Sequence, residues 1–272
     1  MYNIYDLHND FWTEKKFLHG KQNYFNKAKR IANNIAVVVW TTELDAKKAM
    51  QSILKANDFA ICNDGAFLAI EDLHFLSKQN LTEIINMHPK YCGLTWNYNN
   101  NLAGGALDYG NITEFGKYAI KAFEEAGIFV DTSHLNEKSF MTFANITNKP
   151  ILCSHTASYE ICQHARNLKD YQIKIITETN GLVGVCLVSN FLTGKRQSSI
   201  LDYVNHIDYL VCKFGIDYFA IGTDFNGTKH LPNGINNYKD LQKQLSQKLE
   251  AIGYTPKDIN RLFFENANKF FG

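Results

Sequence analysis

The chain has 272 residues, of which 45% are hydrophobic, and a formal net charge of +1. This apolar content suffices for a sizeable core, and α/β barrels of this length commonly form one domain. Lysine and arginine do not gather into a basic stripe, so we expect no nucleic-acid partner. No apolar run reaches the roughly 20 residues that span a bilayer, and the N-terminus does not resemble a signal peptide, so we expect a cytoplasmic protein without membrane contact.

Eight short apolar runs, several of them rich in valine and isoleucine, alternate with helical patterns along the whole chain. The predicted strands span residues 2–8, 35–40, 66–71, 91–96, 128–134, 150–155, 182–188 and 218–224. Near-continuous apolar strands are typical of a parallel sheet that is covered on both faces. Helical spacing marks residues 113–126 and 200–214, and Thr255 followed by Pro256 marks the start of the last helix. The alternation predicts one (β/α)8 TIM-type barrel domain over residues 1–272.

The cysteines form no CxxC pair, and three of them lie inside apolar runs. Reduced, buried thiols are therefore expected rather than disulfides or a thiolate metal site. The six residues are Cys62, Cys92, Cys153, Cys162, Cys186 and Cys212.

The end of the first predicted strand carries the most informative residues of the chain. Side chains alternate along a strand, so His8 and Asp10 project together, and Asp6 shares their face if the strand continues that far. An imidazole and a carboxylate at a strand end suit a divalent ion of the zinc type. A strand end that is polar without binding a metal would show the same residues. Whether this is a metal site therefore depends on whether other strands also end in possible ligands.

Polar residues also follow other predicted strands, at the rim where barrel enzymes carry their chemistry. The third, fifth, sixth and eighth strands end in Glu71, His134, His155 and Asp224. Any one of them, taken alone, is more often a helix cap or a partner for a backbone N–H. Together with His8 and Asp10 they are more ligands than one zinc ion binds, and they fit a site in which two metal ions share a carboxylate. The Asn- and Gly-rich stretch 97–111 is predicted to be a loop on the same rim.

In this order and spacing, the residues resemble the membrane (renal) dipeptidase family of zinc metallopeptidases, within the amidohydrolase superfamily. The resemblance covers nearly the whole chain, and no single piece of it would be specific. It runs through Asp6-Leu7-His8-Asn9-Asp10, Ile70-Glu71, Gly93-Leu94-Thr95-Trp96-Asn97, Val130-Asp131-Thr132-Ser133-His134, Pro150-Ile151-Leu152-Cys153-Ser154-His155, Arg166-Asn167-Leu168-Lys169-Asp170 and Ile221-Gly222-Thr223-Asp224-Phe225-Asn226-Gly227.

The resemblance implies two divalent metal ions, most often Zn²⁺. His8 and Asp10 would hold one ion, His134 and His155 would hold the other, and Glu71 would bridge both. The implied reaction is hydrolysis of a dipeptide by a hydroxide that bridges the metals, and the family accepts a D-residue on the C-terminal side. Relatives often dimerise, so a homodimer is considered as well.

The same resemblance implies the residues that handle the substrate. Asp224 would bind the hydroxide and pass its proton to the leaving amine. Arg166 would bind the free carboxylate of the dipeptide, which its planar fork matches with two hydrogen bonds. Trp96 and Asn97 would contact the substrate.

The chain departs from the family pattern on the substrate side. Trp96 stands where the best-studied branch has a histidine, although many bacterial relatives also have Leu-Thr-Trp-Asn. Val188 stands where a substrate-contacting tyrosine is expected, and Asn226 replaces a usual aspartate. The chain is also short between Asp10 and Glu71. These changes bear on substrate preference and rate, because they leave the expected metal ligands intact.

Two other functions remain open at this point. Another amidohydrolase-superfamily enzyme, such as a deaminase, lactonase or nuclease, is disfavoured by H-x-D in place of H-x-H and by Glu71 in place of a carboxylated lysine. A metal-binding barrel with weak or lost peptidase activity would be indicated by a missing metal ligand, and none is missing.

Overall fold

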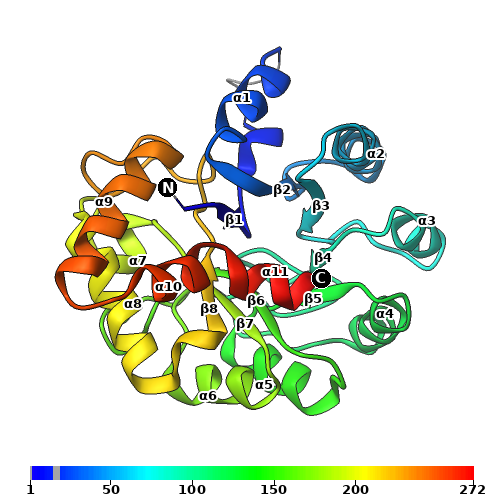
Figure 1. Ribbon diagram of the computed structural model, residues 1–272. Coiled ribbons are helices and arrows are strands. Elements are labelled where there is room, and N and C mark those ends of the chain that lie inside the picture. The colour runs from blue at the N-terminus through cyan, green and yellow to red at the C-terminus, as the bar shows by residue number, and fades with distance from the viewer. Residues whose placement is uncertain (1, 15–18) are drawn as a thin grey trace.

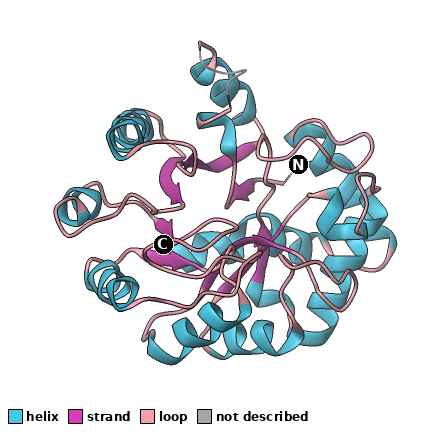
Figure 2. Cartoon of the chain, turned by 180° about the vertical axis from the view of Figure 1, so that it is seen from behind, coloured by secondary structure: helices cyan, strands magenta, loops and turns pink. Residues whose placement is uncertain are grey.

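The computed structural model describes residues 2–14 and 19–272, and its strands form a closed parallel barrel in the order β1 to β8. Figure 2 shows the strands as an inner ring with helices around it. The predicted (β/α)8 TIM-type fold is confirmed. The strands are β1 Ile4–Asp6, β2 Ala32–Trp40, β3 Ala66–Glu71, β4 Tyr91–Gly93, β5 Phe129–Asp131, β6 Leu152–Thr156, β7 Leu182–Val185 and β8 Phe219–Ile221.

The helices alternate with the strands and cover the outside of the barrel (Figure 1). The α-helices are α1 Lys21–Ala28, α2 Ala46–Cys62, α3 Leu81–Asn86, α4 Glu114–Glu125, α5 Glu137–Ile146, α6 Asp170–Glu178, α7 Ser189–Thr193, α8 Ile200–Phe214, α9 Tyr238–Ala251, α10 Pro256–Asn260 and α11 Asn266–Phe271. Short 3-10 turns, η1 Asp10–Trp12 and η3 Ile216–Tyr218, and a π-helical turn, η4 Arg261–Glu265, complete them.

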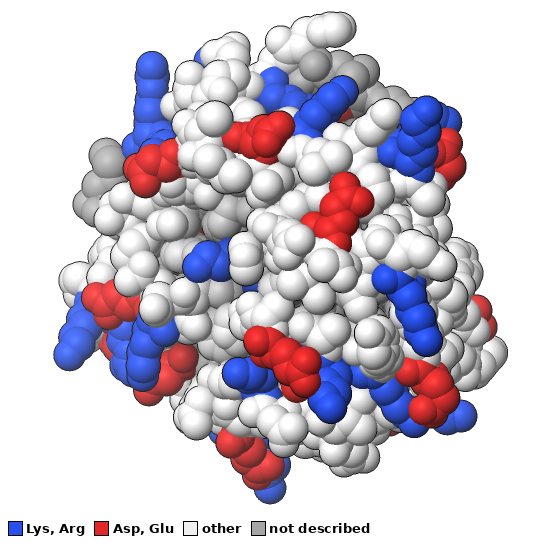
Figure 3. Space-filling model, turned by 90° about the vertical axis from the view of Figure 1, so that its right-hand side faces the viewer, with Lys and Arg blue, Asp and Glu red and all other residues white. Residues whose placement is uncertain are grey.

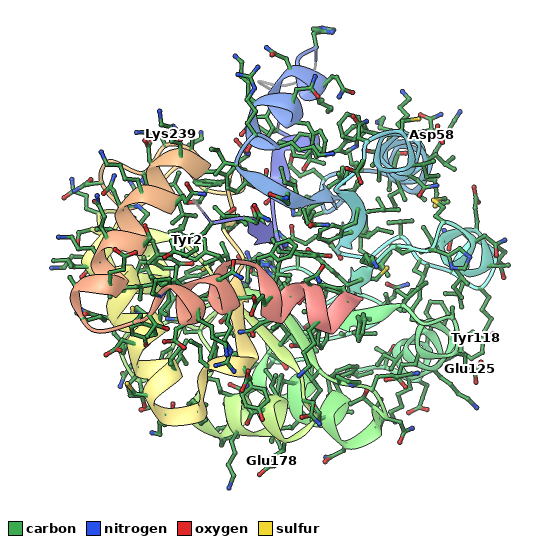
Figure 4. The ribbon with its side chains drawn as sticks, in the orientation of Figure 1. Tyr2, Asp58, Tyr118, Glu125, Glu178 and Lys239 are labelled. Atoms are coloured by element: carbon green, nitrogen blue, oxygen red, sulfur yellow. The ribbon has the colours of Figure 1, made fainter. Side chains whose placement is uncertain are left out.

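Helix α4 shows how the sequence pattern produces this covering layer. Thr113 caps it by accepting a hydrogen bond from the backbone N–H of Gly116 at 3.0 Å. Ile120 and Phe123 lie buried on the barrel side. Tyr118 and Glu125 point outward (Figure 4). One apolar face and one polar face are what a surface helix of such a barrel requires.

Several strands end earlier than predicted, and two buried aspartates explain where β1 and β5 stop. The Asp6 carboxylate accepts hydrogen bonds from the backbone N–H of His8 at 3.3 Å and of Thr223 at 2.8 Å. Asp131 accepts in the same way from Ser133 at 3.2 Å and Ser154 at 2.8 Å. A carboxylate that binds the N–H two residues ahead turns the chain out of the strand.

Asp6 was expected to share a face with His8 and Asp10 only if the strand continued to those residues, and it does not. The strand ends at Asp6, whose carboxylate also accepts hydrogen bonds from the hydroxyls of Thr223 and Tyr238. The turn after Asp6 brings His8 and Asp10 together without the strict alternation of a strand.

Aromatic side chains close the barrel at the N-terminal ends of its strands. Helix α11 lies across this end (Figure 1). The ring of Phe271 stacks on Tyr5 with centroids 5.8 Å apart and meets Phe67 at 6.0 Å and Phe129 at 5.6 Å. Phe270 contacts Phe129 as well, at 4.6 Å. The C-terminal helix thus completes the core on the face opposite the predicted site.

The surface and the cysteines are consistent with a compact barrel. Positive and negative side chains intermix on the face shown in Figure 3. All six cysteines are free thiols, and four of them are buried as expected. Cys62 and Cys212 are exposed, so the expected burial is wrong for these two. Among residues 2–14 and 19–272, no helix has the length and apolar character to cross a bilayer.

The aromatic contacts of α11 predict a stability effect. We expect Phe271→Ala to lower the free energy of unfolding by about 2–3 kcal/mol, below the value for a fully buried phenylalanine because this ring is partly exposed. Tyr118→Ala, on the exposed face of α4, should change it by less than about 0.5 kcal/mol. Urea denaturation measures both. Equal effects of the two changes would contradict a closing role for α11.

Candidate metal centre

Five predicted metal ligands converge on the rim of the barrel, around the carboxylate of Glu71. His134 Nε2 lies 2.6 Å from Glu71 Oε1, and His155 Nε2 lies 3.8 Å from the same oxygen. His8 Nε2 lies 3.8 Å from Glu71 Oε2 and 3.5 Å from Asp10 Oδ2. The side chains come from the ends of β1, β3, β5 and β6, and all five residues are buried.

The other ring nitrogen of each histidine is held by a hydrogen bond. The Tyr91 hydroxyl donates its proton to the Leu7 carbonyl at 2.6 Å. The hydroxyl oxygen of Tyr91 can therefore accept a hydrogen bond from Nδ1–H of His8, which lies 3.1 Å away. Asn97 Oδ1 lies 3.1 Å from Nδ1 of His134 and can only accept. Both rings are thereby set with the Nε2 lone pair free for a cation.

His155 is oriented through a hydroxyl that is itself fixed by a carboxylate. Ser154 Oγ donates to Asp131 Oδ2 at 2.6 Å and lies 2.9 Å from Nδ1 of His155. Because the Ser154 proton goes to Asp131, the oxygen accepts from Nδ1–H of His155 and leaves Nε2 unprotonated. Asp131 therefore both ends β5 and fixes the tautomer of His155.

Burial and neighbouring charges keep two of the imidazoles neutral and the central carboxylate ionised. Burial and the Arg166 guanidinium lower the pKa of His134 to about 4. Burial, with His8 and Arg166, lowers the pKa of His155 well below its usual value. Burial raises the pKa of Glu71, but His134, His8 and Arg166 outweigh it and hold that pKa at about 2.

The carboxylate-rich side of the cluster favours positive charge. Burial lowers the pKa of His8, but Asp10, Glu71 and Asp224 outweigh it and raise that pKa to about 10. Burial and the charge of Asp10 raise the pKa of Asp224 well above its usual value. The field that favours a proton at this place favours a metal cation equally.

Four further observations support metal ions as the occupants of this group of ligands. The Nε2 atoms of His134 and His155, two acceptors, lie only 3.0 Å apart. Within residues 2–14 and 19–272, the buried atoms Nε2 of His8 and Oδ2 of Asp10 have no hydrogen-bond partner. A Cβ on Gly227 would overlap the carboxylates of Asp224 and Asp10, so glycine keeps this space open. Ligand atoms of His8, Glu71 and His155, and of His8, Asp10 and Asp224, lie within 4.8 Å of one another.

A cavity of about 510 Å³ opens above these ligands. Arg166 lines it, is only 4% exposed, and donates from Nη2 to His155 Nε2 at 2.7 Å. Among the described residues its Nε and Nη1 atoms have no partner. Trp96, Asn97 and Asp224 also line the cavity, so the structure brings together every site residue that the sequence indicated.

The departures from the family pattern lie at the same cavity. Val188 lines it beside Phe191, whose ring packs 5.4 Å from the Arg166 guanidinium. Asn226 donates to Asn9 Oδ1 at 2.8 Å and to the Tyr24 hydroxyl at 2.9 Å, so its amide stabilises the neighbouring loops.

Sequence reasoning missed several residues of the site. Trp40 and Phe191 line the cavity, and Tyr91 and Ser154 orient the histidines. Trp40 ends a strand and resembles a core residue in the sequence. The contacts of Tyr91 and Ser154 depend on strand pairing, which no local pattern displays.

The role of Asp131 predicts an effect on metal affinity. Asp131→Asn should place an N–H against Ser154 and free the Ser154 hydroxyl to donate to Nδ1 of His155. We expect metal affinity to fall about 10–100-fold, as for other partners of metal-binding histidines. Chelator competition measures this.

The matched control is Asp108→Asn. Asp108 also accepts backbone N–H groups, from Asn99 and Tyr109, but it contacts none of the three imidazoles. An equal loss in both variants would mean that Asp131 does not act through His155.

Comparisons with known proteins show the family to which this chain belongs. The family described as membrane dipeptidase, peptidase family M19, matches residues 10–272. The uncharacterized protein in the pqqA 5′ region of Klebsiella pneumoniae is 32% identical over 186 residues, 64% of this chain and 68% of that protein. Dipeptidase aclJ of Aspergillus oryzae is 27% identical over 212 residues, 72% of this chain and 50% of aclJ.

A crystal structure shares the fold over the full length. It is a metallopeptidase from Rhodobacter sphaeroides, liganded with a phosphinate mimic of the dipeptide L-Ala-D-Ala. Its TM-score is 0.87 at 18% identity, and the match covers 99% of this chain and 98% of that one. Because the family match extends over nearly the whole chain, this protein belongs to the membrane dipeptidase family, peptidase family M19, and is a hydrolase of peptide bonds.

Proposed function

We propose that this protein hydrolyses free dipeptides with two divalent ions, with Zn²⁺ the best match to its nitrogen and carboxylate ligands. His8 and Asp10 would hold one ion, His134 and His155 would hold the other, and Glu71, which lies between them, would contact both. The observation that carries the proposal is the contact of one buried carboxylate, Glu71, with all three imidazoles.

The reaction divides between the ions and the residues around them. When bound, the ions supply an activated water and polarise the peptide carbonyl. Asp224, at the end of β8, accepts the proton of that water and delivers it to the leaving amine. Its place beside His8 and Asp10 supports this role.

Arg166 selects substrates with a free C-terminal carboxylate. Its guanidinium is buried in the cavity wall, and its Nε and Nη1 have no partner in the described part of the chain. A carboxylate of the substrate can accept hydrogen bonds from these unpartnered N–H groups and compensate the buried positive charge. The Rhodobacter sphaeroides protein was solved with an L-Ala-D-Ala mimic, which supports acceptance of a D-residue at the C-terminal position.

The direct test is hydrolysis of a small panel by protein loaded with Zn²⁺. L-Ala-L-Ala and L-Ala-D-Ala should both be cleaved. The amide L-Ala-L-Ala-NH₂ should react at least about 100-fold more slowly in kcat/KM, because it leaves the buried guanidinium unpaired. Amine release measures the rates. If no free dipeptide is cleaved by fully loaded protein, the proposal fails.

A second test isolates Asp224. Asp224→Asn preserves the shape of the side chain but removes its basic oxygen, so kcat should fall by at least about 100-fold while metal content stays unchanged. Steady-state kinetics and elemental analysis measure the two quantities. Asp217→Asn, a change of an exposed aspartate on η3, is the control and should be neutral. A near wild-type rate for Asp224→Asn would exclude it as the proton carrier.

A further inference from the structure

Trp40 and Trp96 form one wall of the cavity above the metal ligands. Their rings meet edge to face, with centroids 5.4 Å apart and an interplanar angle of 66°. Trp40 ends β2, where it pairs in register with Glu71 of β3. Trp96 follows β4, and its ring lies 6.1 Å from that of His134. The wall therefore begins at the level of the central carboxylate.

Strand order places this wall across the cavity from Arg166. The tryptophans belong to β2 and to the loop after β4, on either side of β3. Arg166 follows β6, and Val188 and Phe191 follow β7. In a closed ring of eight parallel strands, β3 faces β7. A dipeptide that spans the metal ligands thus has one end at Arg166 and the other at the tryptophans.

The charges that line the cavity give the dipeptide a direction. Arg166 attracts the C-terminal carboxylate on the β6–β7 side. Glu14, after η1, and Glu43, after β2, also line the cavity, on the side of Trp40. The ammonium group of a zwitterionic dipeptide is favoured near these carboxylates. The N-terminal residue therefore lies on the tryptophan side.

From this arrangement we propose that Trp40 and Trp96 are the subsite for the side chain of the N-terminal residue, and that the protein prefers dipeptides with an aromatic or large aliphatic residue at that position. The inference rests on the proposed dipeptidase function. Two indole faces offer a large apolar area to a side chain. An aromatic side chain of the substrate would gain additional binding free energy from edge-to-face contact with these rings.

The two rings act as one unit. Trp40 Nε1 is buried and has no hydrogen-bond partner within residues 2–14 and 19–272. The edge-to-face contact with the Trp96 ring helps to orient Trp40. Phenylalanine at position 40 should preserve this contact in part, and alanine should remove it.

The experiment compares two matched dipeptide series in the wild-type protein, Trp40→Ala and Trp40→Phe. In the wild type, kcat/KM should be higher for Phe-Ala than for Gly-Ala. In Trp40→Ala this ratio should fall about tenfold, which is the usual effect of losing one apolar contact in a specificity pocket. Trp40→Phe should restore much of the ratio. The ratio for Ala-Phe to Ala-Gly should not change.

Equilibrium binding gives a readout that does not depend on turnover. In an Asp224→Asn background, Trp40→Ala should raise the Kd of Phe-Ala about tenfold, measured by titration calorimetry, and thermal unfolding should verify that the variant is folded. Tyr109→Ala is the control, because Tyr109 is an aromatic on the β4–α4 loop, is 96% exposed and lies outside this cavity.

The outcomes separate the two proposals. If the wild type cleaves no dipeptide, the proposed function fails. If it cleaves them but Trp40→Ala leaves the Phe-Ala to Gly-Ala ratio unchanged, or changes the Ala-Phe to Ala-Gly ratio instead, the subsite assignment is wrong.

Discussion

The carboxylate of Glu71 is the group on which the rest of the site depends. It reaches imidazoles from three separate strand ends, with Nε2 of His134 at 2.6 Å and those of His8 and His155 at 3.8 Å. A buried carboxylate is unfavourable unless positive charge and hydrogen bonds compensate it. The barrel provides that compensation because parallel strands bring their carboxyl ends to one rim. Removing Glu71 would leave the two halves of the cluster without a common contact.

The two ends of the barrel have different tasks. At the N-terminal end, α11 and the rings of Phe271, Tyr5 and Phe67 close the core. At the C-terminal end, the chain leaves the strands early and turns polar side chains inward. Asp6 and Asp131 control two of these turns by binding backbone N–H groups on their own strand and on its neighbour. The positions of the side chains at the site are therefore set in part by Asp6 and Asp131, which are not themselves proposed to contact the substrate.

The barrel fold and the positions of most of its strands and helices could be predicted from the sequence, because apolar runs and helical spacing reflect burial directly. Polar residues after β1, β3, β5, β6 and β8 then indicated a metal site without knowledge of their contacts. The role of Asp6 could not be predicted, since its carboxylate competes with the strand in a way that periodicity does not show. Arg166 was assigned only through resemblance to a family. Trp40 was missed because a tryptophan at the end of an apolar strand reads as core.

The most direct test of the account is the number and position of metal ions in crystals of protein loaded with Zn²⁺, from anomalous diffraction at the zinc edge. Two peaks are expected, one beside His8 and Asp10 and one beside His134 and His155, with Glu71 within bonding distance of both. A single peak, or two peaks of which only one contacts Glu71, would contradict the account.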